Sequence, residues 1–146
     1  MKIMGLDIGD RRIGIAVSDE LGITAQGKDV IIRENDDISV FKQLEKLINT
    51  YQIKEIVVGL PKQMSGEVGH QATKTLKFVD AMKLNLNIPV KTWDERLTTK
   101  IAKNILKETL STKRKKQKGT VDKLAAILIL QNYLDFCNKK IFNGGR

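Results

Sequence analysis

The sequence predicts an α/β fold built on a mixed β-sheet, and three observations carry this prediction. Two apolar runs, residues 2–8 and 12–19, flank a polar turn that contains Gly9, which is typical of an antiparallel hairpin. Residues 55–61 are almost continuously apolar, which indicates a strand buried on both faces, as in parallel sheets. Amphipathic stretches between the strands supply helices to cover the sheet. The 146 residues suffice for one domain with a substantial core.

The other elements follow from the spacing of apolar residues. Adjacency favours a third antiparallel strand at residues 27–32, which completes a meander. Helical spacing predicts helices, and short apolar runs bounded by Gly or Pro predict strands. In chain order the remaining predictions are a helix over 37–51, a strand over 55–61, a loop over 62–69, a helix over 72–86, a strand over 89–93, a helix over 98–110, an exposed loop over 111–119 and a helix over 120–136.

The final predicted helix is apolar on every side from residue 124 to residue 130, so we expect it to be largely buried. Thr120 is its expected N-cap, which puts Asp122 in the first turn, beside the core. We interpret residues 1–138 as a single domain and residues 139–146 as a flexible C-terminal tail.

The formal charge of +9 is concentrated near the C-terminus. Residues 111–146 carry a net charge of +7, whereas residues 1–110 carry +2. A localised positive field attracts polyanions, so nucleic acid is the first partner to consider. The alternative for a dense basic run is a solvated charged face.

Composition excludes several classes of protein. No apolar run reaches the roughly 18 to 20 residues of a membrane span, and no signal-peptide pattern opens the chain, so we expect a cytoplasmic protein without a membrane partner. With a single cysteine, Cys137, and a single histidine, His70, neither an intramolecular disulfide nor a Cys/His zinc site is expected. We expect His70 to be exposed and without a role, and Trp93 to belong to the core rather than to stack on a base.

Acidic residues lie on three separate predicted elements: Asp7 in the first strand, Asp94 and Glu95 after the fifth, and Asp122 in the last helix. Each has an alternative, purely structural explanation. Asp7 could end a strand, Asp94 and Glu95 could form a charged turn with Arg96, and Asp122 could be a favourable charge at a helix N-terminus. Together they can meet at one edge of the sheet, where their mutual repulsion would require divalent cations. Such a cluster suits phosphodiester hydrolysis with Mg²⁺ or Mn²⁺.

Four motifs follow one another along the chain: GLDIGDRRIGIAVSD, VVGLPKQMSG, WDERLTT and VDKLAAILILQNYL. As a set in this order they resemble the bacterial YqgF family, also called RuvX, of Holliday junction resolvases and pre-16S rRNA processing nucleases. The resemblance covers nearly the whole chain. It implies an RNase H-like fold, with a five-stranded mixed sheet whose first three strands are antiparallel and which helices flank. It also implies a nuclease that processes the 5′ end of pre-16S rRNA or, alternatively, resolves four-way DNA junctions.

The resemblance also assigns the acids. By position, Asp7 is the metal ligand of the first strand, Glu95 is the second acid and Asp122 is the acid of the final helix, together holding Mg²⁺ or Mn²⁺. Side chains alternate along a strand, so Asp94 and Glu95 are expected to face opposite ways. The sequence alone leaves open which of the two enters the site. We favour Glu95 and keep Asp94 as a catalytic candidate.

Basic residues are the candidates for contacts with nucleic acid, whether pre-rRNA or branched DNA. Contacts to phosphates would position a strand without reading its sequence. Arg11, Arg12 and Arg96 are near the predicted acids, although Arg96 could equally pair with Asp94. The basic run supplies Lys113, Arg114, Lys115, Lys116 and Lys118. Ribosomal particles would be a further partner in rRNA processing, and a monomer and a weak homodimer are equally open.

Two interpretations from other classes compete with a nuclease. A D-x-G strand followed by a hairpin also occurs in actin-like and sugar-kinase ATPases, but those proteins close two such domains around a nucleotide and 146 residues supply one. The other interpretation is a noncatalytic nucleic-acid-binding module, whose activity would survive Asp7→Asn.

Overall fold

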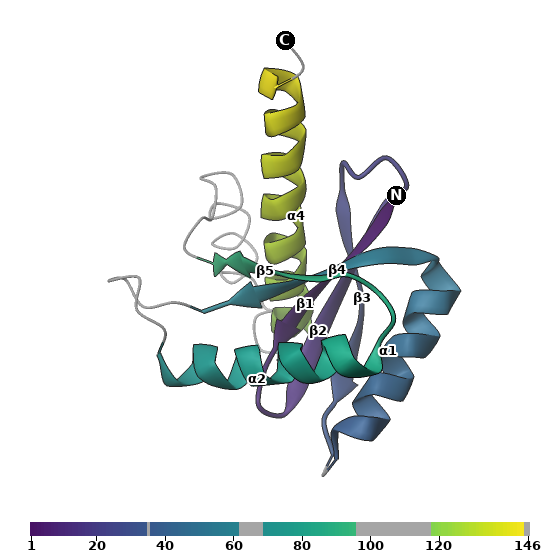
Figure 1. Cartoon of the computed structure of the whole chain (residues 1–146), viewed down its shortest axis with the longest axis vertical. Coiled ribbons are helices and arrows are strands. Elements are labelled where there is room, and N and C mark those ends of the chain that lie inside the picture. The colour runs from purple at the N-terminus through teal and green to yellow at the C-terminus, as the bar shows by residue number, and fades with distance from the viewer. Residues whose placement is uncertain (35, 62–68, 96–117, 145–146) are drawn as a thin grey trace.

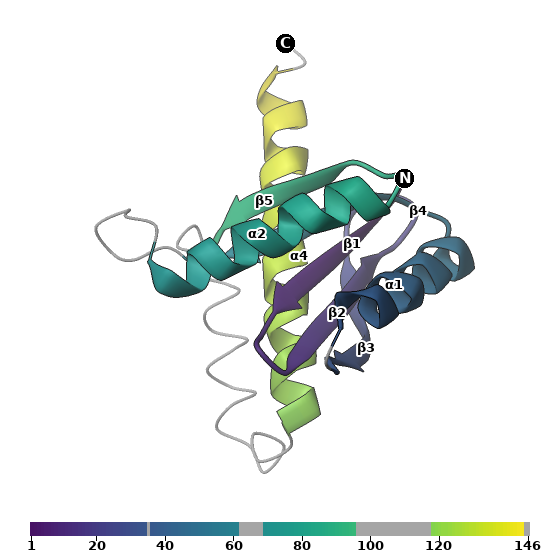
Figure 2. The ribbon, with the colours of Figure 1, turned by 60° about the horizontal axis from the view of Figure 1, so that its bottom comes forward.

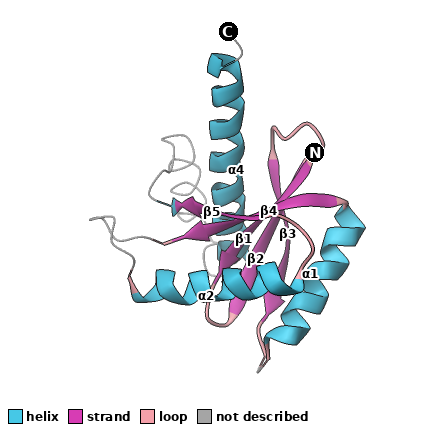
Figure 3. Ribbon diagram, viewed as in Figure 1, coloured by secondary structure: helices cyan, strands magenta, loops and turns pink. Residues whose placement is uncertain are grey.

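The computed structural model describes residues 1–34, 36–61, 69–95 and 118–144, in which a mixed β-sheet lies between helices on both faces (Figures 1 and 2). Figure 3 distinguishes the strands from the helices that flank them. The elements in chain order are β1 (Lys2–Ile8), β2 (Arg12–Ser18), β3 (Ala25–Ile32), α1 (Asp37–Tyr51), β4 (Ile53–Leu60), α2 (His70–Asn85), β5 (Val90–Asp94) and α4 (Lys118–Gly144).

Within these residues the sheet has five strands in the order β3-β2-β1-β4-β5. The first three strands pair antiparallel, while β4 pairs parallel with both β1 and β5. The predicted meander and mixed sheet are therefore confirmed. The largest differences among the strands are that β3 begins at Ala25 and β4 at Ile53, each two residues before the predicted start.

The alternation of side chains along β1 divides the core into two layers. Met4, Leu6 and Ile8 pack on one face with residues of α1 and α2. Ile3 packs on the other face with Leu130 and other residues of α4. Asp7 shares the parity of Ile3, so it points to the face that α4 covers. Figures 1 and 2 show α1 and α2 in front of the sheet and α4 behind it.

Helix α4 is longer at both ends than the sequence predicts. It begins at Lys118 instead of after a Thr120 cap, so Asp122 lies in the second turn and Lys118 is helical rather than part of a loop. Gly119 explains the error, since a glycine inside a helix costs about 1 kcal/mol and favours a later start. The predicted end near Phe136 is also wrong, because residues 137–143 contain neither glycine nor proline that would end the helix before Gly144.

Some predictions fall outside the described residues: the loop at 62–68, the helix over 98–110, Arg96 and the basic residues from 113 to 116. None of the helices in the described segments is long and apolar enough to cross a lipid bilayer.

Candidate functional site

Asp7 stands beside two glycines that leave room for other elements to approach. Gly14 lies opposite Asp7 in the β1–β2 ladder, and a Cβ atom there would be 2.1 Å from the backbone oxygen of Asp122. A Cβ atom on Gly59 would be 3.1 Å from the carboxyl carbon of Glu95. These two glycines therefore allow the backbone of α4 and the side chain of Glu95 to lie directly on the sheet.

The electrostatics of the acids show that they are close to one another. Burial, and then the charge of Asp122, raises the pKa of Asp7 to about 6. Burial, followed by the charges of Asp7 and Asp94, raises the pKa of Glu95 to about 7. Each shift arises because a charged carboxylate is disfavoured by lost water and by nearby negative charge. The structure thus places Asp7 close enough to feel the charge of Asp122 and to act on Glu95, although the three acids belong to separate parts of the chain.

Alternation along β5 distinguishes Glu95 from Asp94. Trp93 packs in the layer beneath α4, with its ring edge-on to Tyr133 at 5.5 Å between ring centres. Asp94 is therefore directed to the opposite face, whereas Glu95 returns to the α4 side and lies over Gly59. Geometry places Glu95 rather than Asp94 with Asp7.

Arg12 joins the cluster through an ion pair. Its Nε donates a hydrogen bond of 2.8 Å to Oδ2 of Asp122, and both side chains are partly exposed. A predicted contact for nucleic acid thus lies directly beside the third acid. Arg11 is exposed in the β1–β2 turn, where its carbonyl oxygen accepts a hydrogen bond from the amide of Arg33.

The donor chemistry of the cluster fits a hard divalent cation, although the side chains would have to move to bind one. Carboxylate oxygens are the ligands that Mg²⁺ and Mn²⁺ prefer, and a cation would relieve the repulsion that raises the pKa values of Asp7 and Glu95. As they stand, no three His, Cys, Asp or Glu side chains of the described residues are arranged to hold a metal ion. The ion pair with Arg12 engages Asp122 instead.

The other candidates lie apart from this cluster. His70 is exposed at the start of α2, as predicted. Trp93 contacts Tyr133 and Phe136, which confirms its place in the core. Cys137 is an unpaired, half-buried thiol.

Sequence reasoning did not identify Gly14 and Gly59 as parts of the site. The signal was present, since both interrupt runs of Ile, Val and Leu in strands, where glycine often marks the close approach of another segment. The pairing of Arg12 with Asp122 had no such signal, because 110 residues separate the two.

Comparisons with known proteins identify the family of this chain. Residues 1–136 match a family model described as "RuvX: Holliday junction resolvase". A protein of Halothermothrix orenii is 52% identical over 141 residues, which cover 95% of this chain and 98% of the relative. A protein of Thermoanaerobacter pseudethanolicus is 48% identical over 135 residues, covering 92% of this chain and 96% of the relative. Both are named "Putative pre-16S rRNA nuclease".

Solved structures share the fold at low sequence identity. Thermus thermophilus RuvC is 15% identical, with a TM-score of 0.57 and coverage of 94% of this chain and 97% of that one. The fowlpox virus resolvase, in a structure with Holliday junction DNA, is 14% identical, with a TM-score of 0.53 and coverage of 94% and 99%. These similarities confirm the RNase H-like fold.

Proposed function

Because the chain belongs to the RuvX family, as its motifs predict, we propose that it is a metal-dependent endonuclease that hydrolyses phosphodiester bonds at the 5′ end of pre-16S rRNA. The observation that carries this proposal is the meeting of Asp7, Glu95 and Asp122 on the face of the sheet that α4 covers. Relatives with about half of their residues identical, named as pre-16S rRNA nucleases, support the substrate. Such a substrate places the protein in the cytoplasm, in contact with ribosomal particles.

Asp7, Glu95 and Asp122 would hold the divalent cation, Mg²⁺ or Mn²⁺. When bound, it would supply a Lewis acid at the phosphate and an activated water molecule. Asp7 and Glu95 have to lose their protons to act as ligands, which their raised pKa values make costly without a cation. Arg12 holds the side chain of Asp122 near the other two acids. Asp94 is the remaining acid of the proposed site and adds negative charge next to Glu95.

The positive charge of the chain would hold the substrate strand. Arg12 lies beside Asp122, and Arg11 is exposed in the adjoining β1–β2 turn, so we propose that both meet a phosphate backbone. Arg96 and the basic run complete the proposed contacts, the run contributing Lys113, Arg114, Lys115, Lys116 and Lys118. These residues belong to the proposed nuclease domain of residues 1–138, which a C-terminal tail of residues 139–146 follows.

Resolution of four-way DNA junctions is the second candidate function. It is favoured by the description of the matching family and by the fold shared with RuvC at a TM-score of 0.57. A resolvase needs two active sites to cut a junction symmetrically, so this function requires a dimer. A stable monomer would favour RNA processing.

The test is cleavage of a pre-16S rRNA fragment and of a four-way DNA junction, side by side, with Mg²⁺ or Mn²⁺. We expect cleavage of the RNA, its loss in Asp7→Asn and Glu95→Gln, and full activity in Asp80→Asn, which replaces an exposed acid on α2. Paired cuts in the junction alone would establish a resolvase. Cleavage by Asp7→Asn at the wild-type rate would refute the site, and binding without any cleavage would identify a noncatalytic module.

A further inference from the structure

A pocket of about 300 Å³ opens on the face of the sheet opposite the acid cluster. It lies between α2, the beginning of α1 and the β1–β2 turn, and Ile8 of β1 contributes to its wall. Ile8 and Asp7 are consecutive and point to opposite faces, so the pocket and the acids lie at the same end of β1 with the sheet between them. The function proposed above does not use this pocket.

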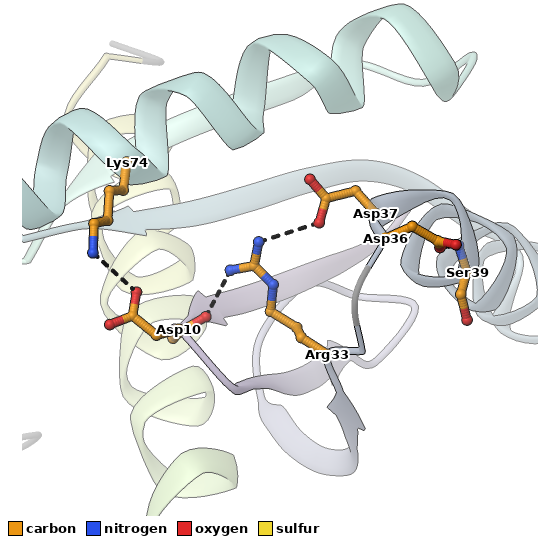
Figure 4. Close-up of polar contacts among 7 residues, drawn as sticks. Asp10, Arg33, Asp36, Asp37, Ser39 and Lys74 are labelled. Carbon is orange, nitrogen blue, oxygen red and sulfur yellow. Dashed lines mark hydrogen bonds and ion pairs between the residues drawn. The ribbon is translucent and has the colours of Figure 1, made fainter.

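The polar lining of the pocket is more positive than negative. Arg33, Lys74 and Lys77 line it together with Asp10 and Asp37. Lys77 makes no ion pair with any residue that the structure describes. The Lys74 amine lies 3.6 Å from Oδ1 of Asp10, and the side chains are 52% and 64% exposed (Figure 4). Such exposed pairs are weak, so an incoming anion can displace Asp10 from Lys74.

Arg33 is held rigidly at the centre of this lining. Its guanidinium donates a hydrogen bond of 2.8 Å to the carbonyl oxygen of Gly9 and one of 3.2 Å to Oδ1 of Asp37 (Figure 4). The guanidinium also lies over the ring of Phe78, 4.7 Å from its centre. Within the described residues these contacts use two of its five N–H donors. The fixed plane and the remaining donors are the features by which arginine stacks on bases and binds phosphates.

The pocket also contains features that a simple anion would not use. Ile8, Phe78 and Ala81 give it an apolar wall, and its volume exceeds that of a single phosphate. Asp10 and Asp37 each keep one carboxylate oxygen outside the ion pairs described, available to accept a hydrogen bond. The matching ligand carries an anionic group, a flat ring and hydrogen-bond donors in one small unit.

From these observations we propose that the pocket binds one unpaired nucleotide. Lys74 and Lys77 hold its phosphate, the guanidinium of Arg33 stacks on its base, and Asp10 and Asp37 accept hydrogen bonds from the sugar hydroxyls or base amino groups. The binding of a nucleotide in this pocket does not depend on the nuclease function proposed above. A position for that nucleotide next to the cut in a substrate strand does rest on that function.

The test measures binding in EDTA, so that cleavage and metal binding play no part. The probes are uridine monophosphate and a short oligouridylate, and the protein is the full chain. Lys77→Gln is compared with Lys83→Gln, the same substitution on the same helix at an exposed residue outside the pocket. We expect Lys77→Gln to weaken oligouridylate binding about fivefold at 0.1 M salt and to reduce the salt slope by about 0.7, the contribution of one neutralised phosphate in a single strand.

Lys83→Gln should leave both quantities unchanged, and thermal melting should show that both variants are folded. If Lys77→Gln weakens binding of uridine monophosphate, the pocket is a site for free nucleotides. If it weakens binding of the oligouridylate only, the pocket is a subsite for a nucleic-acid strand. Equal behaviour of the two variants with both probes would overturn the proposal, as would equally tight, Lys77-dependent binding of oligoglutamate. If the wild-type protein does not cleave RNA but still binds the probes in a Lys77-dependent way, the nuclease function is refuted and the proposed nucleotide site is supported.

Discussion

A methyl group at position 14 would lie 2.1 Å from the backbone oxygen of Asp122, which is closer than non-bonded atoms of this kind approach. Gly14→Ala should therefore push α4 away from the sheet, lower the free energy of unfolding by about 1–3 kcal/mol, as overpacking does, and reduce cleavage by displacing Asp122. Chemical denaturation and the RNA cleavage assay measure the two effects.

Gly27→Ala is the matched control for this substitution. Its Cβ atom would meet the flexible end of Ile127 at 3.0 Å, which can move aside, and the Cβ atom of Lys123 at 3.3 Å, which needs a shift of only a few tenths of an ångström. We expect a smaller loss of stability and no loss of cleavage. If Gly27→Ala were as harmful as Gly14→Ala, the close approach of Asp122 would not be the cause.

The raised pKa values of Asp7 and Glu95 predict how stability depends on pH without metal. Their folded pKa values of about 6 and about 7 exceed the reference values of 3.8 and 4.5, so the folded state binds the protons more tightly. The stability that protonation gives is present at low pH and is lost as the pH rises through 6 and 7. The metal-free protein should therefore lose stability between about pH 4 and pH 7 through these two groups and change little through them at higher pH.

Asp7→Asn isolates the contribution of one of these carboxylates. In EDTA at pH 8 the variant should be more stable than the wild type, on the order of 1 kcal/mol after allowance for solvent screening, and the difference should shrink below pH 5. Thermal melts at both pH values measure it. If the wild type were at least as stable as Asp7→Asn at pH 8, burial and the charge of Asp122 would not disfavour the charged Asp7 carboxylate.

For single residues, the sequence indicates which acids belong to the candidate site better than it indicates which residues they contact. Asp7 and Asp122 are recognisable because each interrupts or adjoins an apolar run. The choice of Glu95 over Asp94 depends on which face of β5 meets α4, and Trp93 shows that only in the folded structure. The pairing of Arg12 with Asp122 depends likewise on tertiary packing.

At the scale of elements, a buried polar contact fastens α4 to the sheet. The hydroxyl of Tyr133 donates a hydrogen bond of 2.7 Å to Glu55 on β4, and the amine of Lys91 on β5 lies 3.2 Å from the other oxygen of Glu55. Glu55 is 7% exposed. Burial and the bond to Glu55 raise the pKa of the Tyr133 phenol well above its usual range, so the group remains a donor.

Tyr133→Phe should cost about 1–3 kcal/mol of stability, because it leaves a buried carboxylate oxygen without its hydrogen bond. Denaturant unfolding measures the loss. Tyr51→Phe is the control, since the hydroxyl of Tyr51 bonds to none of the described residues, and it should change stability little. Equal effects of the two substitutions would show that the contact to Glu55 contributes nothing.

The helices show where local signals suffice. Helix α1 spans residues 37–51, as predicted. Asp36 caps it by accepting a hydrogen bond from the amide of Ser39, and Val40, Phe41 and Leu44 form its buried face. Ile38, in its first turn, is instead 63% exposed. Leu84, an apolar residue of the helix predicted over 72–86, is 88% exposed. It follows the buried Met82 by two positions, which turns it to the opposite side of the helix.

At the scale of the whole molecule, charge is the quantity that reports on substrate binding. Replacing the five cations of the basic run by serine should weaken binding of single-stranded RNA and reduce its salt slope by up to about 3.5, or about 0.7 for each phosphate that is no longer neutralised. The substituted residues are Lys113, Arg114, Lys115, Lys116 and Lys118. Titrations at several salt concentrations measure the slope.

A control variant removes the same charge elsewhere. It replaces five exposed lysines of the described residues, Lys42, Lys46, Lys54, Lys83 and Lys139, by serine. The basic run should account for most of the slope and the control for little. Equal slopes in the two variants would mean that net charge alone matters and that the run is a solvated face.

The topology of the molecule was largely predictable, but its layering was not. A hairpin, a third adjacent strand and the continuously apolar β4 suffice for a mixed sheet. Alternation in β1 shows that Asp7 and Ile8 face opposite ways, yet nothing in the strand says that α4 covers one face while α1 and α2 cover the other. That division is set by which surfaces fit together after the chain collapses.

The position of α4 after all five strands has a consequence during translation. The ribosome makes Asp7 first and Asp122 last, and α4 packs on β1, β2 and β3 only after it has emerged. A nascent chain therefore contains all five strands before it contains all three acids. Synthesis that stops early yields a product with one sheet face uncovered and one acid missing. The proposed nuclease thus stays inactive until α4 has been made.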